Sequence, residues 1–339
     1  MQTRSFLVLL VVTLGLVAAA VYALATGDRA VSPAARNEPV FPDLAAHLGD
    51  LAWMRIAHGK TTIDLNLIAG NWAVVEKGNY PAAAGKVRRL LLGLADLTLI
   101  EPKTARPELF GRLDLDDPSN GKSTLIGLQD RTGKSVAELL VGKTRHDRLG
   151  GGNDAVYVRR PGAGQAWLAR GSLDLPADIA GWLDRRILDI PSTRVTTVRL
   201  TGDDGAELEL KRDSGGKFAV ADAPPDSKFK ADPVLGAPAG ALVDLELDDV
   251  RPSTELPAPG NGAASAIFTT SDGLTVALRV FARDNADWVM IKASGAAESE
   301  KEAEAINARV GRWTYAVAAS RAKLLRTRIA DLVAPQKGS

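Results

Sequence analysis

The chain has 339 residues and a formal net charge of +1, and hydrophobic residues make up 45% of it. These values are ordinary for a globular protein, and no overall field attracts nucleic acid or another acidic polymer. The absence of cysteine excludes disulfides, thiolate catalysis and thiolate metal sites. With only three histidines, His47, His58 and His146, we expect no metal and no other cofactor.

The N-terminus carries the longest apolar run. Residues 6–25 contain no charged side chain, and Arg4 precedes them. Twenty helical residues cover about 30 Å, the thickness of a bilayer core. Positive charge at the start favours a cytoplasmic N-terminus. We therefore expect residues 1–27 to be a single-pass anchor in a bacterial inner membrane, with the bulk of the chain in the periplasm. A signal peptide cleaved after Ala25 is the alternative, although apolar cores of such peptides run about 7–15 residues.

A linker and a group of strands follow the apolar run. Residues 28–48 are rich in alanine, proline and arginine, which is typical of a linker. Apolar residues partly alternate in segments 51–58 and 61–69, which predicts a β-hairpin. A third short strand is predicted at 72–75.

An amphipathic helix is predicted next. It begins at Tyr80-Pro81, because proline suits the first helical position. One helical face collects apolar residues at the expected spacing: Val87, Leu90, Leu91 and Leu94. A helical turn is expected at 107–110, and a second helix at 179–188. Segment 97–100 leads out of the first helix, and strands are predicted at 123–128, 136–141, 155–160 and 165–169.

The second half repeats this order of elements. Segment 217–220 corresponds to segment 71–74 at an offset of 146 residues, and Trp313 corresponds to Trp167 at the same offset. Six such matches in the same order predict a tandem duplication of a unit of about 145 residues. A C-terminal helix is predicted at 320–333. We therefore expect an α+β protein with two related lobes, 49–190 and 191–335, built from mainly antiparallel sheets and packed helices.

Several short motifs together resemble a known family. They occupy the segments 71–74, 80–81, 113–118, 140–143, 157–160 and 182–186. In this order they resemble the bacterial family called domain of unknown function 4340, well over 50–200 and loosely over 200–335. The resemblance implies a membrane-anchored protein outside the cytoplasm, often encoded beside an ABC transporter of the gliding-motility type. It supplies no catalytic residues.

Two motifs suggest ligand sites and are better explained as turns. Segment 121–124 resembles the end of a phosphate-binding loop, but the required earlier glycine is replaced by Asp116, and a strand follows instead of a helix. The acidic segment 114–117 suggests a calcium loop, but residues 118–119 are proline and serine where the pattern needs a ligand and then glycine. We expect capped turns at both places.

A basic segment is the candidate contact for an anion or a partner. It surrounds the glycine-rich loop 150–154 and consists of Lys143, Arg145, Arg148, Arg159 and Arg160. A flexible basic loop can bind an anionic polymer, lipid headgroups or a protein. A solvated hairpin connection is the simpler interpretation. Interleaved aromatic residues, which single-stranded nucleic acid needs, are absent from it.

Six tryptophans raise the question of sugar binding, and core packing is the better explanation for most of them. No serine-nucleophile elbow or zinc-protease motif is present. We therefore expect a non-enzymatic binding or scaffold subunit that contacts an ABC transporter permease or ATPase. A hydrolase of envelope polymers with paired carboxylates and a purely structural spacer are the alternatives.

Overall fold

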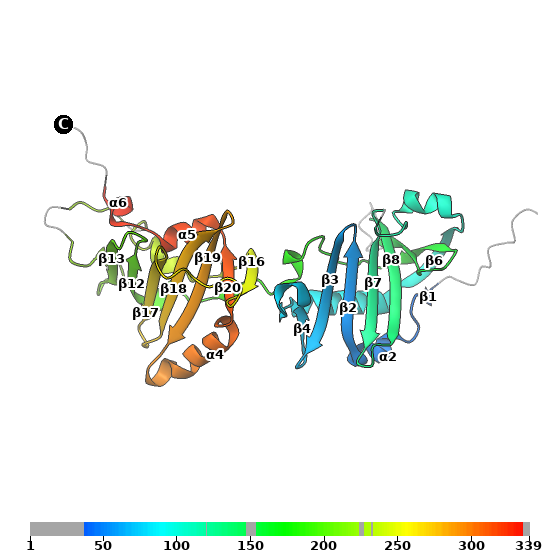
Figure 1. Ribbon diagram of the computed structural model, residues 1–339, viewed down its shortest axis with the longest axis horizontal. Helices are drawn as coiled ribbons and strands as arrows, with labels where there is room; N and C mark the ends of the chain where they lie inside the picture. Colours follow the sequence, from blue (N-terminus) through cyan, green and yellow to red (C-terminus); the bar gives the residue numbers. More distant parts are fainter. Residues whose placement is uncertain (1–36, 120, 147–153, 224–226, 232, 335–339) are drawn as a thin grey trace, which may run out of the picture. The chain divides into compact units, whose positions relative to one another are not determined.

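The computed structural model describes residues 37–119, 121–146, 154–223, 227–231 and 233–334 (Figure 1). The chain divides into two compact units. Unit 1 contains residues 85–177 and the described residues before Ile68, and unit 2 contains residues 68–84 and those from Asp178 onward. The predicted anchor, residues 1–27, lies outside the described residues. Within the described part of the chain, no helix is long and apolar enough to cross a membrane.

Unit 1 is built on an antiparallel sheet with the strand order β1-β6-β10-β9-β8-β7-β2-β3. The strands are β1 (Glu38–Pro39), β2 (Leu51–His58), β3 (Thr61–Ile68), β6 (Thr98–Thr104), β7 (Thr124–Asp130), β8 (Ser135–Arg145), β9 (Ala155–Arg159) and β10 (Ala166–Arg170). Alternate residues of the central strands are buried, as the period-2 pattern predicts, for example Met54 and Ile56 on β2. The sheet strands predicted here are confirmed, with boundaries shifted by a few residues.

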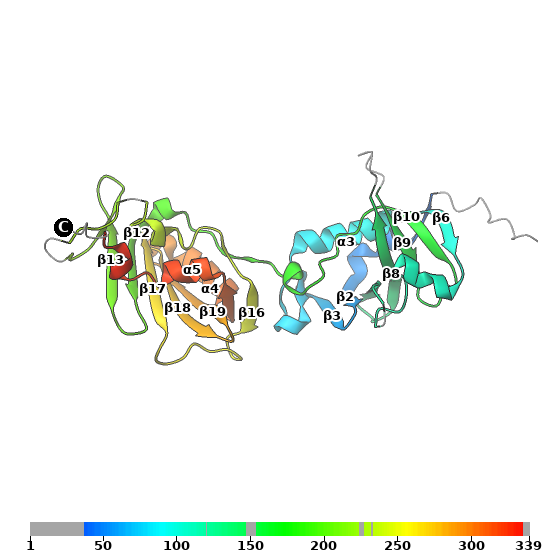
Figure 2. The same ribbon diagram turned by 90° about the horizontal axis from the view of Figure 1, so that it is seen from above.

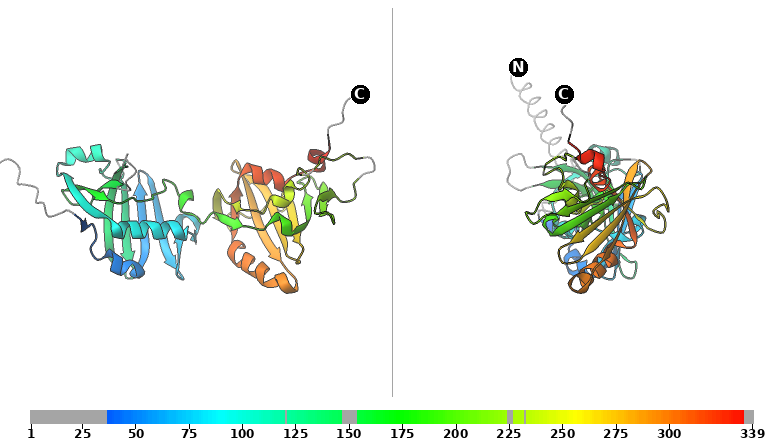
Figure 3. Two further views of the ribbon diagram at one scale, coloured as in Figure 1. Left: turned by 180° about the vertical axis from the view of Figure 1, so that it is seen from behind. Right: turned by 90° about the vertical axis from the view of Figure 1, so that its left-hand side faces the viewer.

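One helix covers the apolar face of this sheet. Helix α3 (Ala84–Asp96) crosses the strands in Figure 2 and again in the rear view of Figure 3. Its buried residues are the four that the helical spacing predicted, Val87, Leu90, Leu91 and Leu94. Shorter helical segments are α2 (Leu44–His47), η2 (Leu48–Asp50) and η4 (Pro107–Leu113).

Unit 2 contains a second antiparallel sheet, with the order β14-β13-β12-β17-β18-β19-β20-β16. Its strands are β12 (Val195–Thr201), β13 (Glu207–Arg212), β14 (Phe218–Val220), β16 (Asp249–Pro252), β17 (Ala264–Thr270), β18 (Thr275–Arg283), β19 (Ala286–Ser294) and β20 (Trp313–Val317). Helices α4 (Glu300–Val310) and α5 (Ala319–Leu325) pack against β19. A small two-stranded sheet pairs β11 (Arg186–Leu188) with β15 (Leu245–Glu246).

The two sheets share one strand order. The strands of the two units are matched in the order in which they occur along the chain. The spatial order β6-β10-β9-β8-β7-β2-β3 of unit 1 then corresponds to the spatial order β16-β20-β19-β18-β17-β12-β13 of unit 2. A cross-strand ion pair also recurs, between Arg55 and Asp64 in unit 1 and between Arg199 and Glu209 in unit 2. The helices differ, because a full helix precedes β6 whereas the 3-10 turn η7 (Ala237–Gly240) precedes β16.

Tyr80 and Pro81 do not open a helix, contrary to the prediction. They form the short strand β5 (Tyr80–Pro81), which pairs with β4 (Asn71–Val74) in unit 2. Burial explains the difference: Tyr80 is 4% exposed, and its ring packs edge-on against Trp313 at 5.1 Å. Its hydroxyl donates to the carbonyl of Asp184 at 3.0 Å. Burial also raises the pKa of the Tyr80 phenol.

The predicted helix at 179–188 is wrong. A single 3-10 turn, η5 (Ala180–Trp182), is followed by extended backbone that leads into β11. The extended segment is held by distant partners: Leu183 bridges to Ala82, and the amide of Leu247 donates to the carbonyl of Arg185 at 2.9 Å. These bonds satisfy backbone groups that a helix would have used internally.

The predicted C-terminal helix at 320–333 is broken into α5 and α6 (Ile329–Leu332). Arg328, between them, has extended backbone, and its amide donates to the carboxylate of Asp331. Its guanidinium also pairs with Asp203 at 2.8 Å. The capping interaction and the ion pair therefore start a new helix at Ile329.

Helix α3 offers a matched test of the core of unit 1. Leu90 is fully buried, and Leu92 on the same helix is 44% exposed. We expect Leu90→Ala to lower the free energy of unfolding by about 2–5 kcal/mol, because it leaves a cavity, and Leu92→Ala to change it by less than about 0.5 kcal/mol. Urea denaturation followed by circular dichroism measures both. Equal effects would contradict the placement of α3.

Candidate functional site

The candidate site is a surface groove in unit 1 beside the first described residues, which we call the N-terminal groove. It encloses about 580 Å³. Its walls come from three separate parts of the chain: residues 41–47, the turn and strand at 130–138, and the pair Arg160 and Pro161. A second hollow of about 330 Å³ shares Pro42 and Arg160 with it.

Arg160 holds the first wall in place. It follows directly after β9, and its guanidinium donates to the carbonyl of Val40 and lies over the ring of Phe41 at 5.2 Å. Val40 and Leu44 are buried on the sheet, at 3% and 2% exposure. One planar cation therefore satisfies a backbone carbonyl and stacks on an aromatic ring, which is a pairing that suits arginine better than lysine.

The second wall is a tight turn between β7 and β8. The carboxylate of Asp130 accepts bonds from the amide of Thr132 at 2.8 Å, the hydroxyl of Thr132 at 2.6 Å and the amide of Lys134 at 3.1 Å. These donors, the Thr132 hydroxyl above all, hold the pKa of Asp130 below its usual range. The carboxylate of Asp130 therefore accepts hydrogen bonds within its own turn and is unsuited to donating a proton.

The rim of the groove carries charges of both signs. Asp43, Lys134 and Glu138 are exposed on it. His47 is also exposed, and its Nδ1 lies 3.2 Å from a carboxylate oxygen of Asp50. A mixed rim of this kind suits a polar protein surface better than it suits a simple anion.

The structure places the five predicted basic residues in different roles. Lys143 donates to the carbonyl of Arg112 at 2.8 Å, so it braces η4. Arg159 donates to the carbonyl of Leu115 at 3.1 Å and lies over the ring of Phe110 at 4.3 Å. Burial lowers the pKa of Arg159.

Of the other three, Arg145 is exposed at the end of β8, and Arg148 lies outside the described residues. Only Arg160 lines the N-terminal groove, while Arg159 and Arg160 both line the second hollow. The four of these side chains that the structure describes do not form one common patch. The predicted contact with an anion or a partner remains a prediction.

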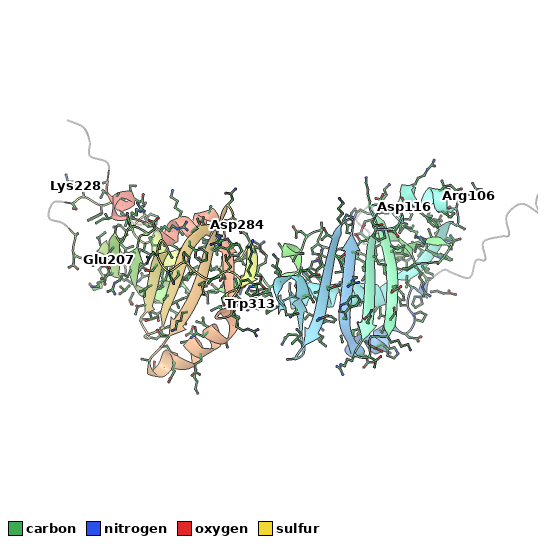
Figure 4. All side chains as sticks on the ribbon, in the orientation of Figure 1. Arg106, Asp116, Glu207, Lys228, Asp284 and Trp313 are labelled. Atoms are coloured by element: carbon green, nitrogen blue, oxygen red, sulfur yellow. The ribbon has the colours of Figure 1, made fainter. Side chains whose placement is uncertain are left out.

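The two turn motifs are structural, as expected. Ser123 is fully buried, its hydroxyl donates to the carbonyl of Asp116, and strand β7 begins at Thr124. Figure 4 shows Asp116 in this turn. Asp117 accepts bonds from the amide of Ser119 at 2.9 Å and from its hydroxyl at 2.5 Å. Over the described residues, no group of three acidic or histidine side chains is placed to hold a metal.

The sequence did not reveal the N-terminal groove, because its walls are far apart along the chain. Residues 41–47 belonged to the predicted linker, and Lys134 and Glu138 lie in the second of two predicted strands and the turn before it. The local signal was Phe41, a large aromatic residue next to Val40 near the end of the predicted linker. Such a residue indicates that the linker ends there and that the chain packs against something.

Arg160→Ala tests how the first wall is held. We expect faster hydrogen exchange over residues 38–47 and a loss of about 1 kcal/mol in the stability of unit 1, because the bond to Val40 and the stacking on Phe41 are removed. Arg145→Ala removes an exposed arginine of the same unit and is the control. Unchanged exchange over residues 38–47 in Arg160→Ala would show that backbone pairing with β6 and apolar burial hold the segment without Arg160.

The turn at Asp130 predicts a pH dependence. Because the pKa of Asp130 is lower in the folded chain than in the unfolded chain, its stabilising effect is present above the unfolded pKa and is lost as pH falls through the folded pKa. We expect Asp130→Ala to destabilise unit 1 at pH 7 and to flatten the fall in stability below about pH 4. Thermal melts between pH 2 and pH 7 measure it, and parallel curves for the two proteins would contradict it.

Comparison with known proteins identifies a family. No curated protein sequence matches the chain. The model of the family described as "Domain of unknown function (DUF4340)" matches residues 72–260, which span parts of both units and more than half of the chain. The match covers the motifs between Trp72 and Arg186 that carry the resemblance and extends it into the second half. The chain therefore belongs to the DUF4340 family.

Proposed function

We propose that this protein is a membrane-anchored binding or scaffold subunit in the periplasm that works with an ABC transporter of the gliding-motility type. The observation that carries the proposal is the open N-terminal groove. It lies beside the residues that follow the predicted anchor, so a tether would hold the groove near a partner embedded in the same membrane. The apolar run 6–25 supports the tether, and the family resemblance supports the choice of partner.

The chemistry of the groove favours a protein partner. Its volume of about 580 Å³ is open to solvent, and its lining includes Phe41 together with acidic and basic side chains. Charges at a rim steer association and select partners, while an aromatic residue supplies buried area. We infer that a polar segment of the permease, or of a protein bound to it, occupies the groove.

We further propose that the two units arose by tandem duplication, as the six sequence matches predicted. The seven corresponding strands in the same spatial order support this, because unrelated sheets of this size have many other orders available. The recurring arginine–acid pair across β2–β3 and β12–β13 supports it independently.

A hydrolase is the weaker alternative. Glycoside hydrolysis needs a carboxyl group whose pKa is raised so that it can act as an acid. In the described part of the chain, every carboxyl group with a shifted pKa is shifted downward: Asp117, Asp130, Glu209 and Asp272. Hydrogen-bond donors cause each shift, and such carboxylates serve as acceptors in turns and ion pairs. A plain spacer is disfavoured because it would need no groove.

Affinity purification of the full-length protein from membranes in mild detergent, followed by mass spectrometry, tests the proposal. We expect an ABC permease or its ATPase to be recovered. Recovery of neither, together with full solubility after removal of residues 1–27, would count against the proposal.

A pair of charge reversals tests whether the groove makes this contact. Lys134 lines the groove, and its amide donates to the carboxylate of Asp130. Lys217 is equally exposed, and its amide donates to the carboxylate of Asp213 in a similar turn of unit 2. We expect Lys134→Glu to reduce recovery of the partner several-fold and Lys217→Glu to leave it unchanged. Equal recovery with both variants would exclude the groove and leave the association itself standing.

A further inference from the structure

Unit 2 contains a second concave site, separate from the N-terminal groove, which we call the indole hollow. It encloses about 350 Å³ and is lined by two tryptophans and several polar side chains: Asn71, Trp72, Asn79, Arg312 and Trp313. All of these residues belong to unit 2, because residues 68–84 do. Small-molecule pockets occupy about 300–1,000 Å³ and combine an apolar wall with a few convergent polar groups, as this hollow does.

A sharp turn of the backbone forms one side of the hollow. Gly78 and Asn79 both have left-handed backbone, with φ of 65° and 64°, and the amide of Asn79 donates to the carbonyl of Val74 at 3.0 Å. A Cβ atom at Gly78 would lie 2.6 Å from Cγ of Pro252, so only glycine permits this approach to β16. The turn thereby brings Trp72 and Asn79 to the hollow that Trp313 lines.

The indole of Trp313 is fixed before any ligand arrives. It lies at the start of β20 and is labelled in Figure 4. The ring of Tyr80 packs edge-on against it at 5.1 Å, and Trp313 is 7% exposed. Trp72, by contrast, is half-buried. The buried indole of Trp313 therefore forms a fixed part of the wall, and the partly exposed indole of Trp72 is the one that can offer a ring face to a ligand.

Polar groups surround the two rings. Asn71, Asn79 and Arg312 are all exposed and line the hollow. An asparagine amide offers both donors and an acceptor, which matches the paired hydroxyls of a sugar. The guanidinium of Arg312 offers a planar set of donors that matches a carboxylate.

We propose that the indole hollow binds a saccharide that carries a carboxylate. The indole face of Trp72 packs on the apolar C–H face of a pyranose ring, the asparagine amides bind the hydroxyls, and the guanidinium of Arg312 selects the acidic sugar. Sugar binding was the less favoured interpretation of the tryptophans in the sequence, and we apply it to Trp72, which is partly exposed and shares the hollow with Asn79 and Arg312. Trp182 and Trp288 are fully buried, and Trp53 has the guanidinium of Arg55 over its ring at 4.7 Å. The proposal is independent of the N-terminal groove.

Calorimetric titration of the full-length protein in detergent tests this site. The probes are an oligogalacturonate, a neutral chito-oligosaccharide of the same length, and a polyproline peptide that would suit a tryptophan groove without being a sugar. We expect saturable binding of the oligogalacturonate, weaker binding of the neutral sugar and none of the peptide. Binding of the peptide alone, or of no probe, would overturn the proposal.

Variants locate the binding. We expect Trp72→Ala to weaken oligogalacturonate binding at least tenfold and Trp72→Phe to weaken it less, because phenylalanine keeps an aromatic face. Arg312→Gln should remove the preference for the acidic sugar over the neutral one. Trp53→Ala, which alters a half-buried tryptophan of unit 1, should leave binding unchanged. Unaltered binding in Trp72→Ala, with its fold verified by circular dichroism, would contradict the site, as would equal losses in Trp72→Ala and Trp53→Ala.

Discussion

Burial of a single face of each antiparallel sheet is the constraint on which the structure depends. Strands with alternating apolar residues have one face that must leave water, and a sheet cannot do this alone. In unit 1 the helix α3 covers that face with Val87, Leu90, Leu91 and Leu94. In unit 2 the described residues before β16 include the 3-10 turn η7 in place of a full helix, and helices α4 and α5 pack on β19. The same strand order is therefore found with different helices packed on the sheet.

Several arginine side chains bond to backbone carbonyls and pack on phenylalanine rings beside the sheets. Arg159 and Arg212 each lie over a phenylalanine ring, at 4.3 and 4.5 Å, while donating to backbone carbonyls. Arg160 does the same with Phe41 and Val40. Arg159 and Arg160 therefore fasten segments outside the strands, at Leu115 and Val40, to the sheet, and Arg212 bonds to the first residue of β12. Because arginines such as Arg159 and Arg160 have these structural partners, a cluster of basic residues in the sequence was a poor indicator of a binding patch.

The fold was predictable where local pattern and tertiary burial agree. Period-2 burial identified the sheet strands, and the spacing of Leu90, Leu91 and Leu94 identified α3. Prediction failed where distant backbone partners decide the conformation, as at Tyr80-Pro81 and at Leu183, whose bonds run to residues far along the chain. Neither concave site was predictable for the same reason. Each is formed by segments that meet only after folding, and the sequence contributes isolated residues such as Phe41 and Trp313.

The two concave sites differ in how rigidly they are built, and this bears on what each can select. In the N-terminal groove, one wall is held by the pairing of β1 with β6, by Arg160 and by the burial of Val40 and Leu44, and its rim charges are exposed. Such a surface can adjust to a protein partner, with charge setting the rate and register of docking. In the indole hollow, Trp313 is locked by Tyr80, and Gly78 fixes the turn against Pro252. A preorganised aromatic wall loses little conformational entropy on binding, which favours discrimination between small rigid ligands. A protein tethered by residues 1–27 could therefore hold one unit to a membrane partner while the other samples an envelope saccharide.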